Sequence, residues 1–177
     1  MKTLTRQQTR KFHKKKLTKK TFDNQYSKLK ITDELIKKAT ERFNKFLGNQ
    51  YSKLDFEKRL AGFIGEEIFQ NEYPKAKRVN SYNYDFILAN KKIEIKSTMI
   101  NSPHDNLNIF IPDYYKQECD YYYTIAINKT YKKAWKIGYL DYKTAGKKMT
   151  VIKKGDNIGS VKAKTDSFLI KFKEFIR

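Results

Sequence analysis

The chain has 177 residues with a formal net charge of +20, and its hydrophobic fraction of 39% is too high for a disordered chain. Its one cysteine, Cys119, excludes an internal disulfide framework, and the lack of a long apolar run excludes a transmembrane helix. We therefore expect a soluble, intracellular protein, in the cytoplasm or with DNA in a nucleoid or nucleus, that binds a polyanion rather than a membrane.

The first 30 residues carry half of the net charge, with eleven lysines and arginines against one acid, Asp23. Few large apolar residues accompany these charges, so residues 1–30 are expected to be a mobile basic arm that binds nucleic acid. A solubilising tail or a nuclear-localisation patch is the alternative. The candidate nucleic-acid-binding residues are Arg6, Arg10, Lys11, Lys14, Lys15, Lys16, Lys19 and Lys20.

Two helices are expected to open the folded domain, residues 31–177. Segment 31–50 has apolar residues near helical spacing, with Thr32 as a candidate N-cap and Gly48 as a stop. A second helix is predicted from about Asp55 to Asn71. The apolar residues of the first are Leu35, Ala39, Phe43 and Phe46, and those of the second are Phe56, Leu60, Phe63, Ile64 and Ile68.

The hydrophobic period then shortens to that of strands. A hairpin is predicted from residues 82–90 and 91–98, with a tight turn at Ala89-Asn90-Lys91. Further elements are two strands at 120–128 and 132–141, a short helix near 112–120, and short strands around a glycine-containing loop at 148–176. Helices followed by strands in this order predict an α/β fold.

The predicted hairpin carries the candidate chemistry. Because side chains alternate along a strand, Glu94 and Lys96 face one way and Ile93 and Ile95 the other. Asp85 on the neighbouring strand can converge with Glu94, and two carboxylates with water or phosphate oxygens suit Mg²⁺. Lys96 can then orient a water or offset charge on a phosphate. The alternative is an amphipathic hairpin whose charges are solvated and paired across the strands.

Three segments in order, GEEIF (65–69), YDFIL (84–88) and IEIKST (93–98), resemble the PD-(D/E)xK nuclease superfamily, also called restriction-endonuclease-like. The resemblance covers residues 55–100 best, and Tyr84 stands where the family usually has proline. It implies an αβββαβ core, a central mixed sheet flanked by helices. It also implies catalytic residues Glu66, Asp85, Glu94 and Lys96, with Mg²⁺, or Mn²⁺ as substitute, bound by Asp85, Glu94 and the Ile95 carbonyl.

Two arguments disagree about which glutamate of the second predicted helix is the site acid, Glu66 or Glu67. At about 100° per residue, Glu67 lies in the middle of the apolar stripe that includes Ile64 and Ile68, and Glu66 lies at its margin. The Gly-Glu register of the family indicates Glu66. We follow that register, because a site acid lies at the edge of a packed face where solvent and metal can enter.

The expected function is that of a Mg²⁺-dependent DNA endonuclease. Restriction, junction resolution, recombination, repair and phage-type cleavage remain open, because fold does not choose among them. Homodimerisation also remains open. The alternative is a non-catalytic nucleic-acid-binding or packaging protein, which would have no reason to retain Asp85, Glu94 and Lys96 together.

Overall fold

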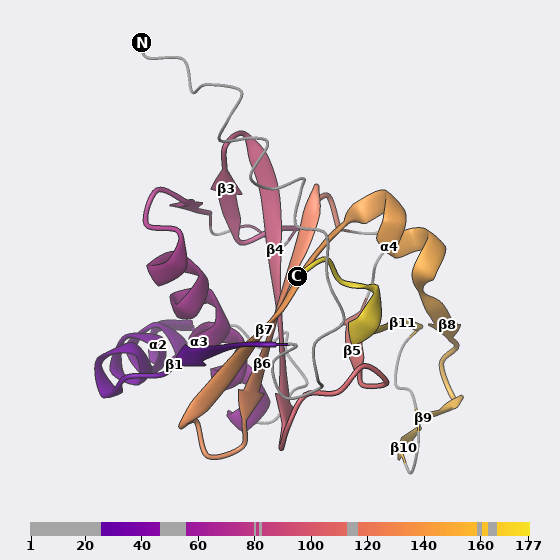
Figure 1. Ribbon diagram of the computed structural model, residues 1–177, viewed down its shortest axis with the longest axis horizontal. Coiled ribbons are helices and arrows are strands. Elements are labelled where there is room, and N and C mark those ends of the chain that lie inside the picture. Colours follow the sequence, from indigo (N-terminus) through magenta and orange to yellow (C-terminus); the bar gives the residue numbers. More distant parts are fainter. Residues whose placement is uncertain are drawn as a thin grey trace.

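The computed structural model of the chain describes residues 26–46, 56–79, 81, 83–112, 117–158, 161–162 and 166–177. Six of the described strands form the central sheet: β1 (Ser27–Lys30), β2 (Lys77–Arg78), β3 (Phe86–Leu88), β4 (Lys91–Ile100), β6 (Tyr121–Asn128) and β7 (Lys133–Asp141). Their order across the sheet is β1-β7-β6-β4-β3-β2 (Figure 1). The sheet is mixed, because β4 and β6 are parallel and the other neighbours are antiparallel.

The other described elements surround this sheet. A three-stranded sheet has the order β5-β11-β8, from β5 (Asn108–Pro112), β8 (Thr150–Ile152) and β11 (Ser167–Lys171). Strands β9 (Asn157–Ile158) and β10 (Val161–Lys162) form a separate two-stranded sheet. The helices are α2 (Asp33–Phe46), α3 (Phe56–Glu72), α4 (Tyr142–Lys148) and the 3₁₀ helix η3 (Phe172–Glu174). None of these described helices is long and apolar enough to span a membrane.

Figure 1 shows α2 and α3 on one side of the central sheet, and α4, η3 and the three-stranded sheet on the other. Each sheet face therefore has its own hydrophobic core. Ile93 and Ile95 of β4 pack into the core beneath α2 and α3, whereas Ile100 of β4 and Tyr122 of β6 pack into the opposite core. The predicted α/β class is confirmed, as a mixed central sheet flanked by helices.

Both predicted helices are present. The Leu35 N–H donates to Thr32 Oγ1 at 3.2 Å, so Thr32 caps α2 as expected. Leu35, Ala39 and Phe43 are buried, whereas Phe46 at the helix end is 40% exposed. Helix α3 runs one residue beyond the predicted end. Gly48, the expected stop of α2, lies outside the described residues.

The predicted hairpin is also confirmed. Strands β3 and β4 pair antiparallel, with Phe86 opposite Ile93 and Leu88 opposite Lys91. The turn consists of two residues, Ala89 and Asn90, whose φ angles of 49° and 61° are typical of a tight hairpin turn with the twist of the flanking strands. This turn sets the register that carries Asp85 and Glu94 to the same end of the hairpin.

The expected boundary at residue 30 between arm and domain is wrong. Ser27–Lys30 form β1, an edge strand that pairs with β7, and Leu29 packs against the core beneath α2 and α3. The alternation Lys28-Leu29-Lys30 explains this strand, because one apolar side chain turns inward and two lysines stay on the exposed edge. Residues 1–25, with all the candidate basic residues of the arm, lie outside the described residues.

The segment 112–120 differs from the predicted short helix where it can be compared. Residues 113–116 lie outside the described residues, and residues 117–120 are not helical. Farther along, the predicted strands at 120–128 and 132–141 are confirmed as β6 and β7. The tail forms short strands as expected, with Gly155 at a φ of 94° in a turn. Helix α4, whose N-cap is Asp141, was not predicted from the sequence.

Gly65 fixes how closely α3 approaches the sheet. A Cβ atom at this position would lie 1.9 Å from Ser97 Oγ and 3.2 Å from Ser97 Cβ. The side chain of Ser97 on β4 therefore occupies the space that any larger residue would need. Because Glu66 follows directly, this contact also sets the distance of its carboxylate from the hairpin.

Two alanine substitutions in α3 test this contact. Gly65→Ala should lower the free energy of unfolding by about 1–3 kcal/mol, because the new methyl group overpacks the helix–sheet contact. Gly62→Ala is the matched control, since nothing lies within 4 Å of its Cβ position. It should instead stabilise the helix by about 0.5–1 kcal/mol. Urea unfolding of both variants measures the difference, and equal shifts would contradict the close approach.

Candidate active site

Asp85 lies directly before β3, where the hairpin ladder ends. Its N–H donates to the Ile93 carbonyl at 3.0 Å, and its carboxylate accepts the Ile95 N–H at 2.7 Å. The carboxylate thus takes the place of a further ladder residue of β3. Because the N–H and C=O of a strand residue point toward the same neighbouring strand, the Ile95 carbonyl lies on the side of Asp85.

Glu94 and Lys96 lie on one face of β4, as the alternation predicts. Lys96 Nζ is 2.7 Å from Glu94 Oε1, and the two side chains are only 13% and 10% exposed respectively. The carboxylate of Asp85 is held on the same strand, by the N–H of Ile95, which lies between Glu94 and Lys96. The hairpin therefore brings together Asp85, Glu94 and Lys96, the three residues singled out on it.

The carboxyl groups of Asp85 and Glu94 are buried and each lies within reach of other charges. Burial and then the charge of Glu94 raise the pKa of Asp85 to about 7. Burial also raises the pKa of Glu94, although Lys96 opposes this effect. Two carboxylates this close in the interior repel each other, so the pair favours uptake of a positive charge, whether a proton or a cation.

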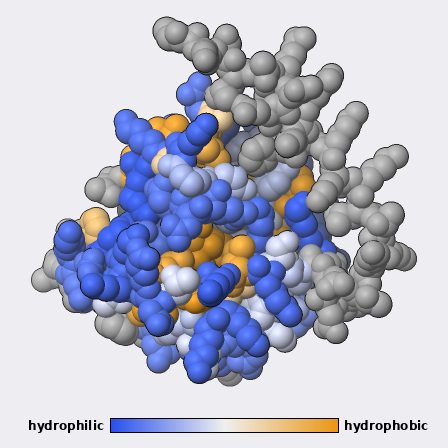
Figure 2. All heavy atoms as spheres, turned by 60° about the vertical axis from the view of Figure 1, so that its left-hand side comes forward, coloured by the Kyte–Doolittle hydropathy of each residue, from blue (hydrophilic) through white to orange (hydrophobic). Residues whose placement is uncertain are grey.

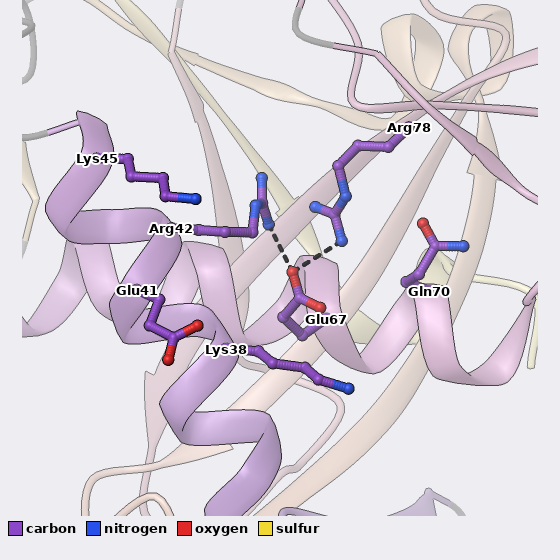
Figure 3. Close-up of a pocket in the computed structure, with 7 residues that line it drawn as sticks. All are labelled: Lys38, Glu41, Arg42, Lys45, Glu67, Gln70 and Arg78. Carbon is purple, nitrogen blue, oxygen red and sulfur yellow. Dashed lines mark hydrogen bonds and ion pairs between the residues drawn. The ribbon is translucent and has the colours of Figure 1, made fainter.

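Glu66 and Glu67 of α3 are tied to two arginines from different elements. Arg42 of α2 donates to Glu66 Oε2 and to Glu67 Oε1, each at 2.8 Å. Arg78 of β2 donates to the same two oxygens at 2.7 and 2.8 Å. Figure 3 shows both guanidinium groups converging on Glu67 from α2 and from β2. Each arginine thus bridges both acids, in a cluster of four charged side chains.

The two glutamates have different surroundings. The Glu67 side chain is 9% exposed, and its partners are the arginines rather than a lysine stem or a backbone N–H. Burial and then the charge of Asp85 raise the pKa of Glu66 to about 7, against the effect of Arg42 and Arg78. Glu66 also raises the pKa of Glu94. Glu66 is therefore the acid of α3 that interacts with the hairpin carboxyls.

Within the described residues, no three His, Cys, Asp or Glu side chains are grouped closely enough to hold a metal ion by themselves. The expected ligand set is smaller, two carboxylates and the backbone carbonyl of Ile95. The candidate DNA-binding residues Arg6, Arg10, Lys11, Lys14, Lys15, Lys16, Lys19 and Lys20 lie outside the described residues.

Arg42 and Arg78 are the members of the site that the sequence analysis missed. A signal existed, because two adjacent glutamates near the packed face of a helix need cationic partners. The identity of those partners depends on how α2 and β2 pack beside α3. In comparisons with known proteins, no family model matches the chain, and no curated protein matches it significantly.

The arginine cluster predicts unequal effects of two isosteric substitutions. Glu67→Gln should lower the free energy of unfolding by about 2 kcal/mol, because it weakens charge-assisted hydrogen bonds of two arginines in a buried setting. Glu66→Gln should cost less than half as much, since it also removes repulsion from Asp85 and Glu94. Chemical unfolding at pH 8 compares them, and a larger loss for Glu66→Gln would contradict the assignment.

Proposed function

We propose that the protein is a metal-dependent DNA endonuclease with a restriction-endonuclease-like core. The observation that carries this proposal is the cluster of Asp85, Glu94 and Lys96 on the hairpin, with Asp85 hydrogen-bonded to the Ile95 N–H. Burying two acids and a lysine together is unfavourable for a purely structural hairpin. Hydrolysis of a phosphodiester, by contrast, uses carboxylates for a cation and a positive charge for the phosphate.

The order of elements supports the proposal. Helix α3 is followed by the antiparallel strands β2, β3 and β4, and then by β6, which is parallel to β4. The PD-(D/E)xK resemblance implies this sequence of a helix, three strands and a crossover to a fourth strand. Within the described residues the connection from β4 to β6 contains β5 and no helix, which departs from the αβββαβ order.

The donor set fits Mg²⁺. The charge of Glu94 acts on the buried carboxyl group of Asp85, so a cation bound by both carboxylates would relieve their repulsion. Asp85, Glu94 and the Ile95 carbonyl would hold the ion, leaving positions for water and phosphate oxygens, and Mn²⁺ would substitute for it. When bound, Mg²⁺ would supply Lewis-acid stabilisation of the negative charge that develops on the phosphate.

Lys96 and Glu66 take supporting roles around this centre. Lys96, held by Glu94 at 2.7 Å, can orient the attacking water and offset charge on the scissile phosphate. Water attacks phosphorus and loses one proton, the bond from phosphorus to the leaving sugar oxygen breaks, and that oxygen takes up one proton, so the proton count is unchanged. Glu66 adds a carboxylate beside Asp85 that can accept a hydrogen bond from water.

DNA as substrate is supported by the net charge of +20, because each neutralised phosphate adds to affinity for a duplex. Incubation with supercoiled plasmid, linear duplex, single-stranded DNA and a four-way junction, each with Mg²⁺, Mn²⁺ or EDTA, tests the activity. Cleavage that requires the cation is the expected result. Binding without cleavage of any substrate would favour the non-catalytic or packaging alternative.

Substitutions in the cluster should separate cleavage from binding. Asp85→Asn, Glu94→Gln and Lys96→Ala should each slow cleavage at least about a hundredfold, equivalent to about 2.7 kcal/mol of barrier. Asp85→Asn and Glu94→Gln should keep or tighten DNA binding, because each removes negative charge near the phosphate. Glu66→Gln should reduce kcat about tenfold.

Glu118→Gln is the matched control for these cleavage assays, since Glu118 is an exposed carboxylate on the segment that leads into β6. Its cleavage rate should equal that of the unmodified protein. Wild-type cleavage by Asp85→Asn or Glu94→Gln in Mg²⁺ would show that the proposed centre is wrong.

The basic arm makes a separate prediction about DNA affinity. Deletion of residues 1–25 removes nine lysines and arginines. The deletion stops before Tyr26, because the Tyr26 hydroxyl donates to Asp105 at 2.6 Å and accepts from Arg177 at 2.9 Å. The log–log salt dependence of binding should flatten by about 0.9 for each phosphate that the arm neutralises, up to a ceiling of about nine phosphates.

Deletion of residues 1–5, which removes one lysine, is the control for the longer truncation. Fluorescence anisotropy with a labelled duplex at several salt concentrations gives both slopes. If the two truncations have the same slope, the arm does not bind DNA.

A further inference from the structure

A pocket of about 330 Å³ lies between α2, α3 and β2, behind the Glu66–Glu67 pair. Figure 3 shows Lys38, Arg42 and Lys45 reaching into it from α2, and Arg78 from the opposite side. The remaining lining residues are Glu41, Glu67 and Gln70. The surface around α2 and α3, which comes forward in Figure 2, is mostly hydrophilic with a smaller hydrophobic area. Four cations thus surround one open, polar hollow.

Arg42 and Arg78 are held in position, and each keeps N–H donors that Glu66 and Glu67 do not use. A guanidinium group has five N–H donors, and Arg42 and Arg78 each use two of them on Glu66 and Glu67. The guanidinium groups also lie over aromatic rings, Arg42 over Phe63 at 5.1 Å and Arg78 over Phe86 at 4.7 Å. The acids and rings fix both groups, so a ligand that bound the remaining donors would not have to order them.

The free donors of the pocket, rather than its net charge, suit an anion. Four cations line it, and four acids lie in the lining or on these cations: Glu41 and Glu67 in the lining, Glu66 on the same arginines, and Glu34 on Lys38 at 2.8 Å. Lys45 forms no ion pair with any other described residue. Two guanidinium groups, each planar, with nearby ammonium groups match the oxygens of a phosphate.

The position of the pocket relates it to the candidate active site. Arg42 and Arg78 both bind Glu66 Oε2, and Arg78 on β2 pairs with Phe86 of β3, the residue that follows Asp85. A phosphate on the arginines would therefore lie across Glu66 from Asp85 and Glu94. We propose that this pocket binds a backbone phosphate of the nucleic acid next to the scissile one, and so sets the register of the strand in the site.

This inference rests on the proposed function in one respect, that DNA is the ligand. Lys45→Gln tests it, because Lys45 is an exposed side chain whose loss does not disturb the arginine cluster. Lys37→Gln is the matched control, an exposed lysine on the same helix that does not line the pocket. Binding of a labelled duplex is measured in EDTA at several salt concentrations, so that no cleavage occurs.

Lys45→Gln should weaken binding and reduce the salt slope by about 0.9, the value for one neutralised phosphate, while Lys37→Gln leaves the slope unchanged. Lys38→Gln combined with Lys45→Gln should reduce it further. Equal slopes for Lys45→Gln and Lys37→Gln would overturn the proposal. Loss of binding to anionic phospholipid vesicles in Lys45→Gln, with an unchanged DNA slope, would also overturn it.

A plasmid-cleavage assay on the same variants separates this inference from the proposed function. If the unmodified protein cuts DNA and Lys45→Gln and Lys37→Gln have equal salt slopes, phosphate binding in the pocket is rejected and the nuclease activity is supported. If the slopes differ as expected and no cation supports cleavage, phosphate binding in the pocket is supported and the nuclease activity is rejected.

Discussion

The buried carboxyl groups of Asp85 and Glu94 repel each other, and the surrounding structure holds both in place. The two-residue turn at Ala89 and Asn90 sets the hairpin register, and the Ile95 N–H holds the Asp85 carboxylate. Lys96 neutralises one side of the pair. Without these interactions, two desolvated carboxylates would repel each other and open this end of the hairpin.

The charges around the site form a series with cations at both ends. Lys96 binds Glu94, the charge of Glu94 acts on Asp85, and the charge of Asp85 acts on Glu66, which binds the arginines of α2 and β2. Gly65 permits this arrangement, because its missing Cβ lets α3 approach Ser97 on β4. The acids are concentrated in the middle, with cations on either side. A divalent cation and two phosphates of one strand would complement this distribution.

Local patterns predicted the parts of the structure that depend on neighbours in sequence. The period of two placed Glu94 and Lys96 on one face, and helical periodicity indicated correctly that Glu67 is buried. The cluster of Arg42 and Arg78 was not predictable, since its ion pairs join three elements whose packing no local pattern specifies. β1 was missed because three alternating residues beside a basic segment are too short a signal to distinguish an edge strand from an arm.

The most direct test of the account is whether the acid pair binds a cation in the absence of DNA. Melting temperatures of the full chain, Asp85→Asn and Glu118→Gln are compared in Mg²⁺ and in EDTA at matched ionic strength. Mg²⁺ should raise the melting temperature of the full chain and of Glu118→Gln, through a gain in stability of about 2.7 kcal/mol at a hundred times Kd. It should leave the melting temperature of Asp85→Asn unchanged. An equal shift in all three proteins, or none in any, would contradict a metal centre at Asp85 and Glu94.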